Sequence, residues 1–347
     1  MKAAYITARE TIEFREDDIP SLGPGEALVR IAYTGICGSD LHAYHGRSPS
    51  AVLPVVPGHE YSGVIEEIAE GSRNPDDLKP GDKVVGWIIL ACGACDACIA
   101  GHTNLCRNLK SYGTQTSGTF REYLAVPLRM LYKLPTDADL RLYALAEPMA
   151  VAVYAVRETP VLVGDSVYVI GGGPIGVCTA IAARRAGASM VVISEICEEK
   201  RERIETMGFP FLNPGTCDPV AEAMEMTNGR GFSCVLEASA SKAGYELMTK
   251  VGSFRAKAIN IGQTRETMPL IPWDLMKTEM RLKAIRIHPQ AVFGLVVEMF
   301  KNADKSFTDT LYKLISHDYS FDRLQEAFDV CAIDRSHCKV MVKVKEA

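Results

Sequence analysis

Four cysteines stand close together in one short segment and could hold a metal ion. Two, two and seven residues separate Cys92, Cys95, Cys98 and Cys106, in a stretch rich in Gly and Ala. Structural zinc sites are tetrahedral, and a shell of four thiolates leaves no position for a substrate. In a chain without a secretion signal, closely spaced cysteines favour metal over disulfides. We therefore expect these four residues to bind a structural zinc ion.

A glycine-rich turn offers a second kind of chemistry, the binding of a dinucleotide. The apolar run Ser166–Ile170 leads into Gly171, Gly172, Gly173, Pro174, Ile175 and Gly176. In the pattern G-x-G-x-x-G, Gly171 makes the turn, Gly173 lets the backbone approach a pyrophosphate, and Gly176 allows close helix packing. A helix beginning at Pro174 would direct its positive end toward the phosphates. Because a strand precedes this motif and a helix follows, the context supports a dinucleotide site.

An acidic residue, Glu195, closes the next apolar run, Met190–Ser194. A carboxylate there can accept hydrogen bonds from the ribose hydroxyls of NAD and would repel the 2′-phosphate of NADP. The structural alternative is a solvated acid at a strand end. Lys200 and Arg201 follow closely and could tolerate a phosphate. We expect NAD as the cofactor, with Glu195 and Lys200 at its adenosine ribose.

Three further polar clusters have both structural and chemical interpretations. They are the segment from Cys37 to His42 (Cys-Gly-Ser-Asp-Leu-His), the triplet Gly58-His59-Glu60, and Glu147 before Pro148. Singly, each could cap a turn, occupy a loop or begin a helix. Together with the cysteine segment and the glycine turn, they suggest a metal-dependent active site.

The chain has two kinds of sequence pattern, which predict the elements that position these residues. Up to about residue 150, short Val- and Ile-rich runs cut by Gly and Pro are typical of a β-rich domain; examples are Glu26–Tyr33, Tyr61–Ile68, Lys83–Ile89 and Phe120–Pro127. From Val161, strands alternate with glycine turns and helices, which predicts a doubly wound α/β sheet of parallel strands; the strands expected are Ser166–Ile170, Met190–Ser194, Phe211–Leu212, Phe232–Leu236, Ala258–Ile261 and Leu282–Ile287. The tail from about His288 could belong to either domain.

Composition limits the function classes. The length of 347 residues suits two domains, and 47% hydrophobic with 23% charged residues is typical of a globular protein. A net charge of -5 gives no electrostatic footprint for nucleic acid or an anionic membrane. No signal peptide and no apolar stretch of about twenty residues is apparent. We expect a cytoplasmic protein without nucleic-acid or membrane partners.

In order and spacing, these motifs resemble the zinc-containing medium-chain dehydrogenase/reductase family over essentially the whole chain. The chain is more similar to the polyol (sorbitol-type), butanediol and threonine dehydrogenases than to the liver alcohol dehydrogenases. The resemblance implies a GroES-like β-rich catalytic domain over residues 1–150, a Rossmann domain over 151–288, and a return to the catalytic domain over 289–347. We also expect a homodimer or homotetramer.

The resemblance further implies a second, catalytic zinc ion. Its family ligands are the Cys of C-G-[ST]-D and the His of G-H-E, which correspond to Cys37 and His59. The third ligand is a cysteine in liver-type enzymes and a glutamate in polyol-type enzymes; here Glu147 occupies that place. Glu60, beside His59, is a further candidate ligand or exchange partner. The direct third ligand stays open between the two carboxylates.

Such a site would perform alcohol oxidation. Zinc held by a thiolate, an imidazole and a carboxylate keeps a position for substrate and lowers the pKa of an alcohol hydroxyl, so that hydride can pass to NAD. The resemblance implies that Ser39 takes the hydroxyl proton and His42 passes it to solvent, with the cofactor ribose between them. Imidazole titrates near neutral pH and suits this role. His45 is a rival whose spacing from Ser39 fits less well.

Alternatives remain at two levels. A zinc-free quinone or enoyl reductase would share the fold but lack the metal motifs, and a non-catalytic zinc- and nucleotide-binding protein is a second class. Among alcohol or ketone substrates, polyols, sugar acids, 2,3-butanediol and threonine all remain open, including a threonine-type rather than a polyol dehydrogenase.

Overall fold

The structure, a computed structural model, describes residues 1–48, 51–74 and 76–346. The chain divides into two compact units, one formed by Met1–Glu147 with Pro289–Ala347 and the other by Pro148–His288. The second unit is therefore a continuous segment that interrupts the first in sequence.

The first unit is built on a seven-stranded sheet with the order β16-β17-β3-β4-β5-β9, and β8 pairs with β3 outside this path. Its strands are β1 (Lys2–Ala8), β2 (Thr11–Glu16), β3 (Glu26–Gly35), β4 (Glu60–Ile68), β5 (Lys83–Gly86), β6 (Ile89–Leu90), β7 (Lys110–Ser111), β8 (Tyr123–Pro127), β9 (Leu131–Lys133), β16 (Ile315–Ser320) and β17 (Lys339–Lys343). Its helices are α1 (Gly38–Tyr44), α2 (Asp96–Ile99), η1 (Thr103–Leu105), η2 (Leu128–Met130), α3 (Leu140–Tyr143), α10 (Gln290–Lys301), α11 (Lys305–Leu314), η4 (Phe321–Arg323) and α12 (Leu324–Ile333).

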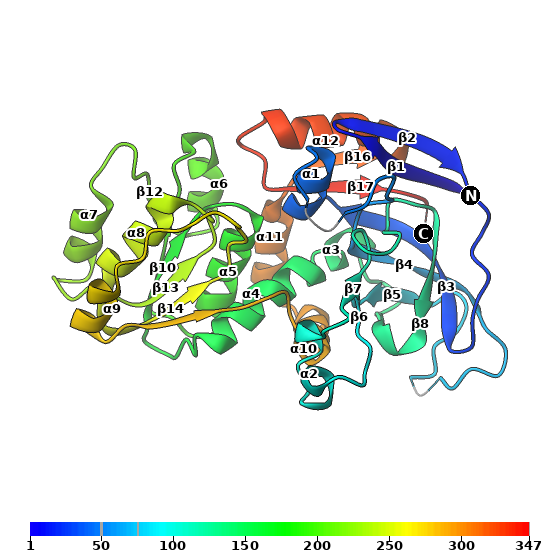
Figure 1. The fold of residues 1–347 in the computed structure, drawn as a ribbon, viewed down its shortest axis with the longest axis horizontal. Helices are drawn as coiled ribbons and strands as arrows, with labels where there is room; N and C mark the ends of the chain where they lie inside the picture. Colours follow the sequence, from blue (N-terminus) through cyan, green and yellow to red (C-terminus); the bar gives the residue numbers. More distant parts are fainter. Residues whose placement is uncertain (49–50, 75, 347) are drawn as a thin grey trace. The chain divides into compact units, whose positions relative to one another are not determined.

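The tail of the chain completes this sheet. Strand β17 pairs antiparallel with β3, with Met341 opposite Gly35, and β16 pairs parallel with β17. Figure 1 shows the red strand β17 beside the blue strand β3. All of β17 except Lys343 is buried, because the strand has neighbours on both sides and α12 packs on it.

The second unit is a six-stranded parallel sheet with the order β12-β11-β10-β13-β14-β15. Its elements are α4 (Ala146–Glu158, which begins in the first unit), β10 (Ser166–Ile170), α5 (Pro174–Arg185), β11 (Met190–Ser194), η3 (Glu198–Lys200), α6 (Arg201–Thr206), β12 (Phe211–Leu212), α7 (Pro219–Met226), β13 (Phe232–Glu237), α8 (Lys242–Val251), β14 (Gly252–Asn260), α9 (Pro272–Thr278) and β15 (Arg281–Ala284). Strand β10 is almost entirely buried, as expected for a central parallel strand covered on both faces. The predicted fold class, a β-rich domain plus a doubly wound α/β sheet, is confirmed.

Several of the expected strands have different bounds in the structure, and the differences at two of them have a clear physical cause. The run Lys83–Ile89 is not one strand: β5 ends at Gly86, and β6 pairs separately with β7 beside the cysteine segment. The run Leu282–Ile287 stops at Ala284, because Ala284 pairs with Asn260, the last residue of β14. Apolar residues beyond a strand's last pairing partner cannot extend the ladder.

Within the described residues, no helix is both long and apolar enough to cross a membrane.

Candidate active site

The ends of two neighbouring strands bring the predicted metal ligands together. Strands β3 and β4 are antiparallel, with Gly35 at the end of β3 opposite Glu60 at the start of β4. Cys37 follows β3 as the N-cap of α1, and His59 immediately precedes β4. Cys37 and His59 are therefore close in space although 21 residues separate them in the sequence, because the antiparallel pairing places the end of β3 beside the start of β4.

The donor atoms of Cys37, His59 and Glu60 all lie within 4.8 Å of one another. One cation with ligands at about 2.0–2.3 Å holds its donor atoms less than about 4.6 Å apart, so these three side chains fit a zinc ion after small movements. Thiolate, imidazole and carboxylate are all zinc donors. This cluster is the first structural feature that supports a metal-dependent reaction.

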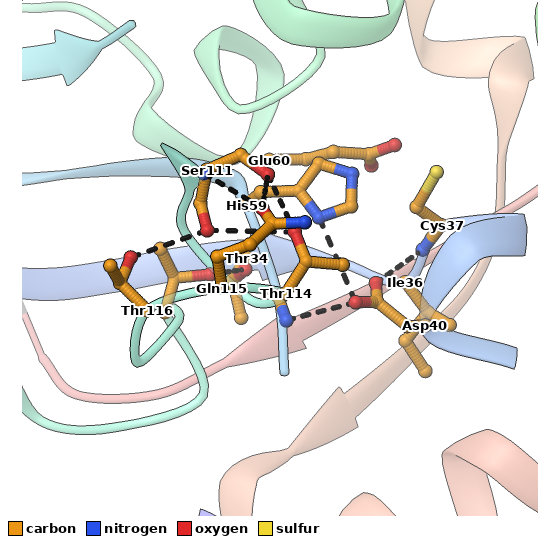
Figure 2. A network of polar contacts seen from close by, with 12 residues as sticks. Thr34, Ile36, Cys37, Asp40, His59, Glu60, Ser111, Thr114, Gln115 and Thr116 are labelled. Atoms are coloured by element: carbon orange, nitrogen blue, oxygen red, sulfur yellow. Dashed lines mark hydrogen bonds and ion pairs between the residues drawn. The ribbon is translucent and has the colours of Figure 1, made fainter. Parts of the chain in front are cut away.

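Asp40 ties the two ligand-bearing segments to each other, as Figure 2 shows. Its carboxylate accepts one hydrogen bond from the backbone N–H of Cys37 and one from that of Gly58, each at 2.9 Å. The same carboxylate lies 3.7 Å from Nδ1 of His59. An outer carboxylate beside a ligating histidine orients the ring, so Asp40 acts on both predicted ligands.

The electrostatics of the cluster are those of a site prepared for a cation. Burial disfavours a charged His59, but the negative charges of Asp40, Cys37 and Glu147 outweigh it and raise the pKa of His59 well above its usual value. In the metal-free protein the site therefore attracts a proton. A zinc ion would replace that proton and satisfy the same anionic groups.

Glu60 is shared between this cluster and a buried cation. Both carboxylate oxygens of Glu60 lie 2.7 Å from Nζ of Lys339 on β17, and the two side chains are 1% and 3% exposed. Burial raises the pKa of Glu60 against the pull of Lys339, and Glu147 raises it further. A Cβ atom on Gly35 would lie 2.2 Å from Oε2 of Glu60, so only glycine leaves room for this carboxylate.

Glu147 lies near the cluster without belonging to the set of atoms that meet within 4.8 Å. It is buried, in the first turn of α4. Its charge acts on both His59 and Glu60 and raises the pKa of each. The structure thus brings Glu60 into the cluster and places Glu147 beside it.

The two residues expected to carry the proton share one face of α1. Ser39 and His42 are three residues apart in this helix, and His42 is exposed. The rival, His45, ends the helix, and its Nδ1 lies 3.1 Å from a carboxylate oxygen of Glu10. Because His45 already has an acidic partner, the local contacts favour His42 as the residue that exchanges protons with solvent.

The four-cysteine segment forms a compact sulfur cluster. The Sγ atoms of Cys92, Cys95, Cys98 and Cys106 lie within 4.8 Å of one another, and the Cys92–Cys98 distance is 4.0 Å. A tetrahedral zinc ion with Zn–S bonds of about 2.3 Å would hold its sulfurs about 3.8 Å apart. Backbone N–H groups of Arg107 and Cys98 lower the pKa of Cys95 to about 6. These residues fit a closed zinc site, and none of the eleven cysteines, all of which lie in the described part of the chain, forms a disulfide.

The glycine turn has the geometry expected for a dinucleotide site. Gly171 has a φ of 101°, which favours glycine. A Cβ atom on Gly176 would lie 1.9 Å from the carbonyl oxygen of Gly171, so the helix can approach the strand only with glycine there. Gly173 is the N-cap of α5, and Pro174 is its first residue. The N-terminus of α5 therefore opens directly after the turn.

Glu195 lies against this turn and is joined to Lys200. One carboxylate oxygen accepts a hydrogen bond from the N–H of Gly172 and the other from that of Cys197, both at 2.8 Å. Nζ of Lys200 lies 3.4 Å from the oxygen that Gly172 contacts. A Cβ atom on Gly172 would lie 2.9 Å from Cβ of Glu195, which explains why the middle residue of the three is also glycine.

Two residues at the metal cluster had no role in the sequence analysis beyond a possible turn cap. Asp40 could have been found from its spacing, since an acid three residues after an N-cap is the pattern of a reciprocal capping box. Lys339 carries a weaker signal, a lysine at the start of a strand that is mostly apolar and buried. A sequence cannot show that its partner is Glu60, which is 279 positions away.

Comparison with known proteins defines the class. Residues 23–136 match the alcohol dehydrogenase GroES-like domain, and residues 174–302 match the zinc-binding dehydrogenase domain. The chain is 34% identical to 2-dehydro-3-deoxy-L-galactonate 5-dehydrogenase of Pseudoalteromonas atlantica over 86% of its own length and 87% of that protein. It is 35% identical to L-threonine 3-dehydrogenase of Pyrococcus abyssi, over 92% and 91% of the two chains.

Solved structures give the same class. A zinc-binding dehydrogenase from Sinorhizobium meliloti, crystallised with NADP, superposes with a TM-score of 0.89 over 99% of both chains at 30% identity. The chain belongs to the zinc-containing medium-chain dehydrogenase/reductase family. It is a zinc-dependent oxidoreductase that transfers hydride between a secondary alcohol and a nicotinamide dinucleotide, as the motifs predict.

Proposed function

We propose that the enzyme oxidises secondary alcohols that carry a polar group on the neighbouring carbon, with NAD as the hydride acceptor. The observation that carries this proposal is the convergence of Cys37, His59 and Glu60 beside Glu147, a donor set with two carboxylates and one sulfur. Carboxylate donors give a harder metal site than thiolates. Such a site suits a substrate that offers a second oxygen or nitrogen.

The proposed catalytic zinc shell consists of Cys37, His59 and Glu147. Glu60 is the less suitable third ligand, because Lys339 neutralises it through two contacts of 2.7 Å. Glu147 is buried in the first turn of α4, and its charge acts on both His59 and Glu60. Glu60 then remains as a carboxylate that can exchange with Glu147.

The residues of the chain divide the chemistry between them. Zinc, when bound, lowers the pKa of an alcohol hydroxyl, and NAD accepts the hydride. Ser39 accepts the hydroxyl proton at its Oγ and at the same time gives up its own hydroxyl proton, and His42, on the same face of α1 and exposed to water, releases a proton to solvent. Asp40 keeps the Cys37 and His59 segments in register during turnover.

The contacts of Glu195 support NAD over NADP. Each of its carboxylate oxygens has one backbone donor and retains lone pairs for a ribose hydroxyl. Lys200 lies 3.4 Å away and offsets part of the repulsion that a 2′-phosphate would meet. We therefore propose a preference for NAD rather than an absolute requirement.

The substrate class follows from the metal site and from the relatives. One relative is a dehydrogenase of a sugar acid and another of L-threonine, each a secondary alcohol with polar neighbours. We propose a polyol or hydroxy acid as the substrate. L-Threonine is the second candidate, favoured by the 35% identity to the Pyrococcus abyssi enzyme.

A substrate panel tests the proposal. Initial rates of NADH formation are compared for vicinal diols, aldonic acids, L-threonine and ethanol. One additional hydrogen bond or metal contact in the transition state is worth roughly 1.5 kcal/mol, so kcat/KM should exceed that for ethanol by at least about tenfold. Higher kcat/KM for ethanol than for every polar substrate would contradict the proposed class.

Two variants test the third ligand. Glu147→Ala should lose catalytic zinc or activity, whereas Glu147→Cys should keep zinc with altered turnover, because a thiolate is also a zinc donor. Zinc is counted by atomic emission on freshly purified protein. Normal zinc content and normal kcat in Glu147→Ala would remove Glu147 from the shell and leave Glu60 as the ligand.

We also propose a cytoplasmic homo-oligomer, a dimer or a tetramer. The edge strand β15 belongs to the same unit as four exposed apolar side chains, Phe254, Ile271, Trp273 and Met276, each at least 60% exposed. Edge strands and apolar patches of this kind are suited to pairing with a second copy. The free thiols of the sulfur cluster suit a reducing compartment.

A further inference from the structure

A buried carboxylate stands at the carboxyl edge of the parallel sheet and has no part in the sites described above. It belongs to Glu237, the last residue of β13, which is 0% exposed. The sheet order places β13 directly beside β10, on the side opposite to β11. In this topology a dinucleotide lies across the ends of the central strands, where the strand order reverses. With the adenosine half at Glu195, which directly follows β11, the nicotinamide half extends toward β13.

The Glu237 carboxylate is used to shape the loop that follows it, Ala238–Ser241. It accepts hydrogen bonds from the backbone N–H of Ser239 at 2.8 Å and from that of Ala240 at 3.0 Å. The Ser239 hydroxyl also donates to it. Ala240 has a φ of 54°, a conformation that a non-glycine residue adopts only when its surroundings hold it there.

Two glycines make room for this carboxylate. A Cβ atom on Gly262 would lie 2.8 Å from Oε2 of Glu237 and 2.6 Å from the nitrogen of Ala240. A Cβ atom on Gly244 in α8 would lie 2.8 Å from Oε1 of Glu237. Glycine at these two positions therefore leaves space for the carboxylate beside the loop Ala238–Ser241.

The charge itself is costly at this position. In the part of the chain that the structure describes, no Lys, Arg or His forms an ion pair with Glu237, and burial raises the pKa of its carboxyl group. An apolar residue at the end of a buried strand would avoid this cost. The carboxyl group is thus better explained by what it holds in place than by the stability of the sheet.

The loop that Glu237 holds lies directly against the phosphate-binding turn. The N–H of Ala238 donates to the carbonyl oxygen of Ile170 at 2.8 Å, and a Cβ atom on Gly171 would lie 3.0 Å from the nitrogen of Ser239. A displacement of the loop would therefore change the space beside the first glycine of the turn, on the β13 side.

We propose that Glu237 is a positioning residue for the nicotinamide half of the dinucleotide, acting through the loop Ala238–Ser241. Glu237 fixes the backbone of Ser239 and Ala240, which lies beside Gly171, in the position that fits the nicotinamide half of the cofactor. The adenosine half, held at Glu195 on the other side of β10, does not depend on it.

Glu237→Gln tests this proposal, because the amide keeps the size of the side chain but removes the negative charge that the loop donors contact, and its NH2 group replaces an acceptor near the N–H of Ala240. The dissociation constant of NADH, measured by nicotinamide fluorescence, should rise by about ten- to a hundredfold, the effect of losing a hydrogen bond to a charged group. The dissociation constant of AMP, which occupies only the adenosine half, should stay within about twofold of its original value. In turnover, the KM for NAD should rise more than kcat falls.

The control is Glu246→Gln, which makes the same change at an exposed position of α8 and should leave both dissociation constants unchanged. Unchanged NADH binding in Glu237→Gln would overturn the proposal, and so would an equal loss of NADH and AMP binding, which would indicate a general distortion of the unit. If Glu237→Gln does not fold, Ser239→Ala decides the question, since Ser239 is exposed and its replacement removes the side-chain donor to Glu237, together with the contacts of that hydroxyl with Ser241, and leaves both backbone donors in place. Selective weakening of NADH supports the proposal, and unchanged NADH binding refutes it.

Discussion

Replacing Lys339 with Met should destabilise the first unit by about 3–5 kcal/mol, because it leaves the buried Glu60 carboxylate without the Lys339 cation. The two N–O distances of 2.7 Å and the exposed fractions of 1% and 3% set this magnitude. At 2.7 Å, Coulomb's law with an effective dielectric constant of about 20 gives an attraction of roughly 6 kcal/mol. Part of it is offset by the desolvation of both ions.

Urea unfolding followed by tryptophan fluorescence can measure this loss. Trp87 is 3% exposed and directly follows β5, which pairs with β4, the strand that begins at Glu60. The other tryptophan, Trp273, is 65% exposed in the second unit, so a Trp273→Phe background isolates the signal of the first. The free zinc concentration is kept constant in all samples, because bound metal adds to stability.

A double-mutant cycle supplies the control. Lys339→Met combined with Glu60→Gln removes both charges and should recover most of the loss, to within about 1.5 kcal/mol of the original protein. A loss below about 1 kcal/mol in Lys339→Met alone would refute the reasoning. A double variant as unstable as the single one would show that packing of the lysine stem, and not its charge, stabilises the unit.

Four further results are expected. Cys106→Ser should lose one of two zinc ions and reduce stability, whereas Cys37→Ser should lose the other and abolish turnover with the fold intact; a single zinc per fully active chain would contradict both. Glu195→Ser should lower the ratio of kcat/KM for NAD to kcat/KM for NADP. A higher kcat/KM for NADP than for NAD in the unaltered enzyme would show that this carboxylate has another role. His42→Ala should slow alcohol oxidation by roughly ten- to a thousandfold at neutral pH and less in alkali, where hydroxide can accept the proton; an equal loss at every pH would indicate a structural role. Because the raised pKa of His59 keeps the metal-free site protonated, zinc affinity should increase as the pH rises toward that pKa, which a competition titration with a chromophoric chelator measures. An affinity that does not change with pH would exclude this proton exchange.

Local spacing was sufficient to predict the parts of the sites that are local in sequence. Cys92, Cys95, Cys98 and Cys106 lie within fifteen residues, and their sulfurs meet in the structure. Gly171 is required by its φ of 101°, and Gly176 by its close approach to the carbonyl oxygen of Gly171 inside one strand–turn–helix unit. In both cases the residues that define the ligand-binding geometry belong to the motif itself.

Contacts between distant segments could not be predicted in this way. Lys339 meets Glu60 only because β17 pairs with β3 and β3 with β4, and a register error of one residue would point Lys339 away. The Glu237 carboxylate turns back to its own loop, and that requires two glycines from different elements, Gly244 and Gly262. Contacts of this kind join side chains that become neighbours only through the order and register of the strands. That order and register could not be predicted from local spacing.

The pairing of β17 with β3 has a consequence for the synthesis of the protein. During translation, Cys37, His59 and Glu60 leave the ribosome long before Lys339, which follows Glu60 by 279 positions. At about 5–20 residues per second, that interval lasts about a quarter of a minute to a minute. The second unit, a continuous segment between the two, can fold during this time. Until β17 arrives, the carboxylate of Glu60 stays in water, so burial of the Glu60–Lys339 ion pair is one of the last events in the folding of the chain.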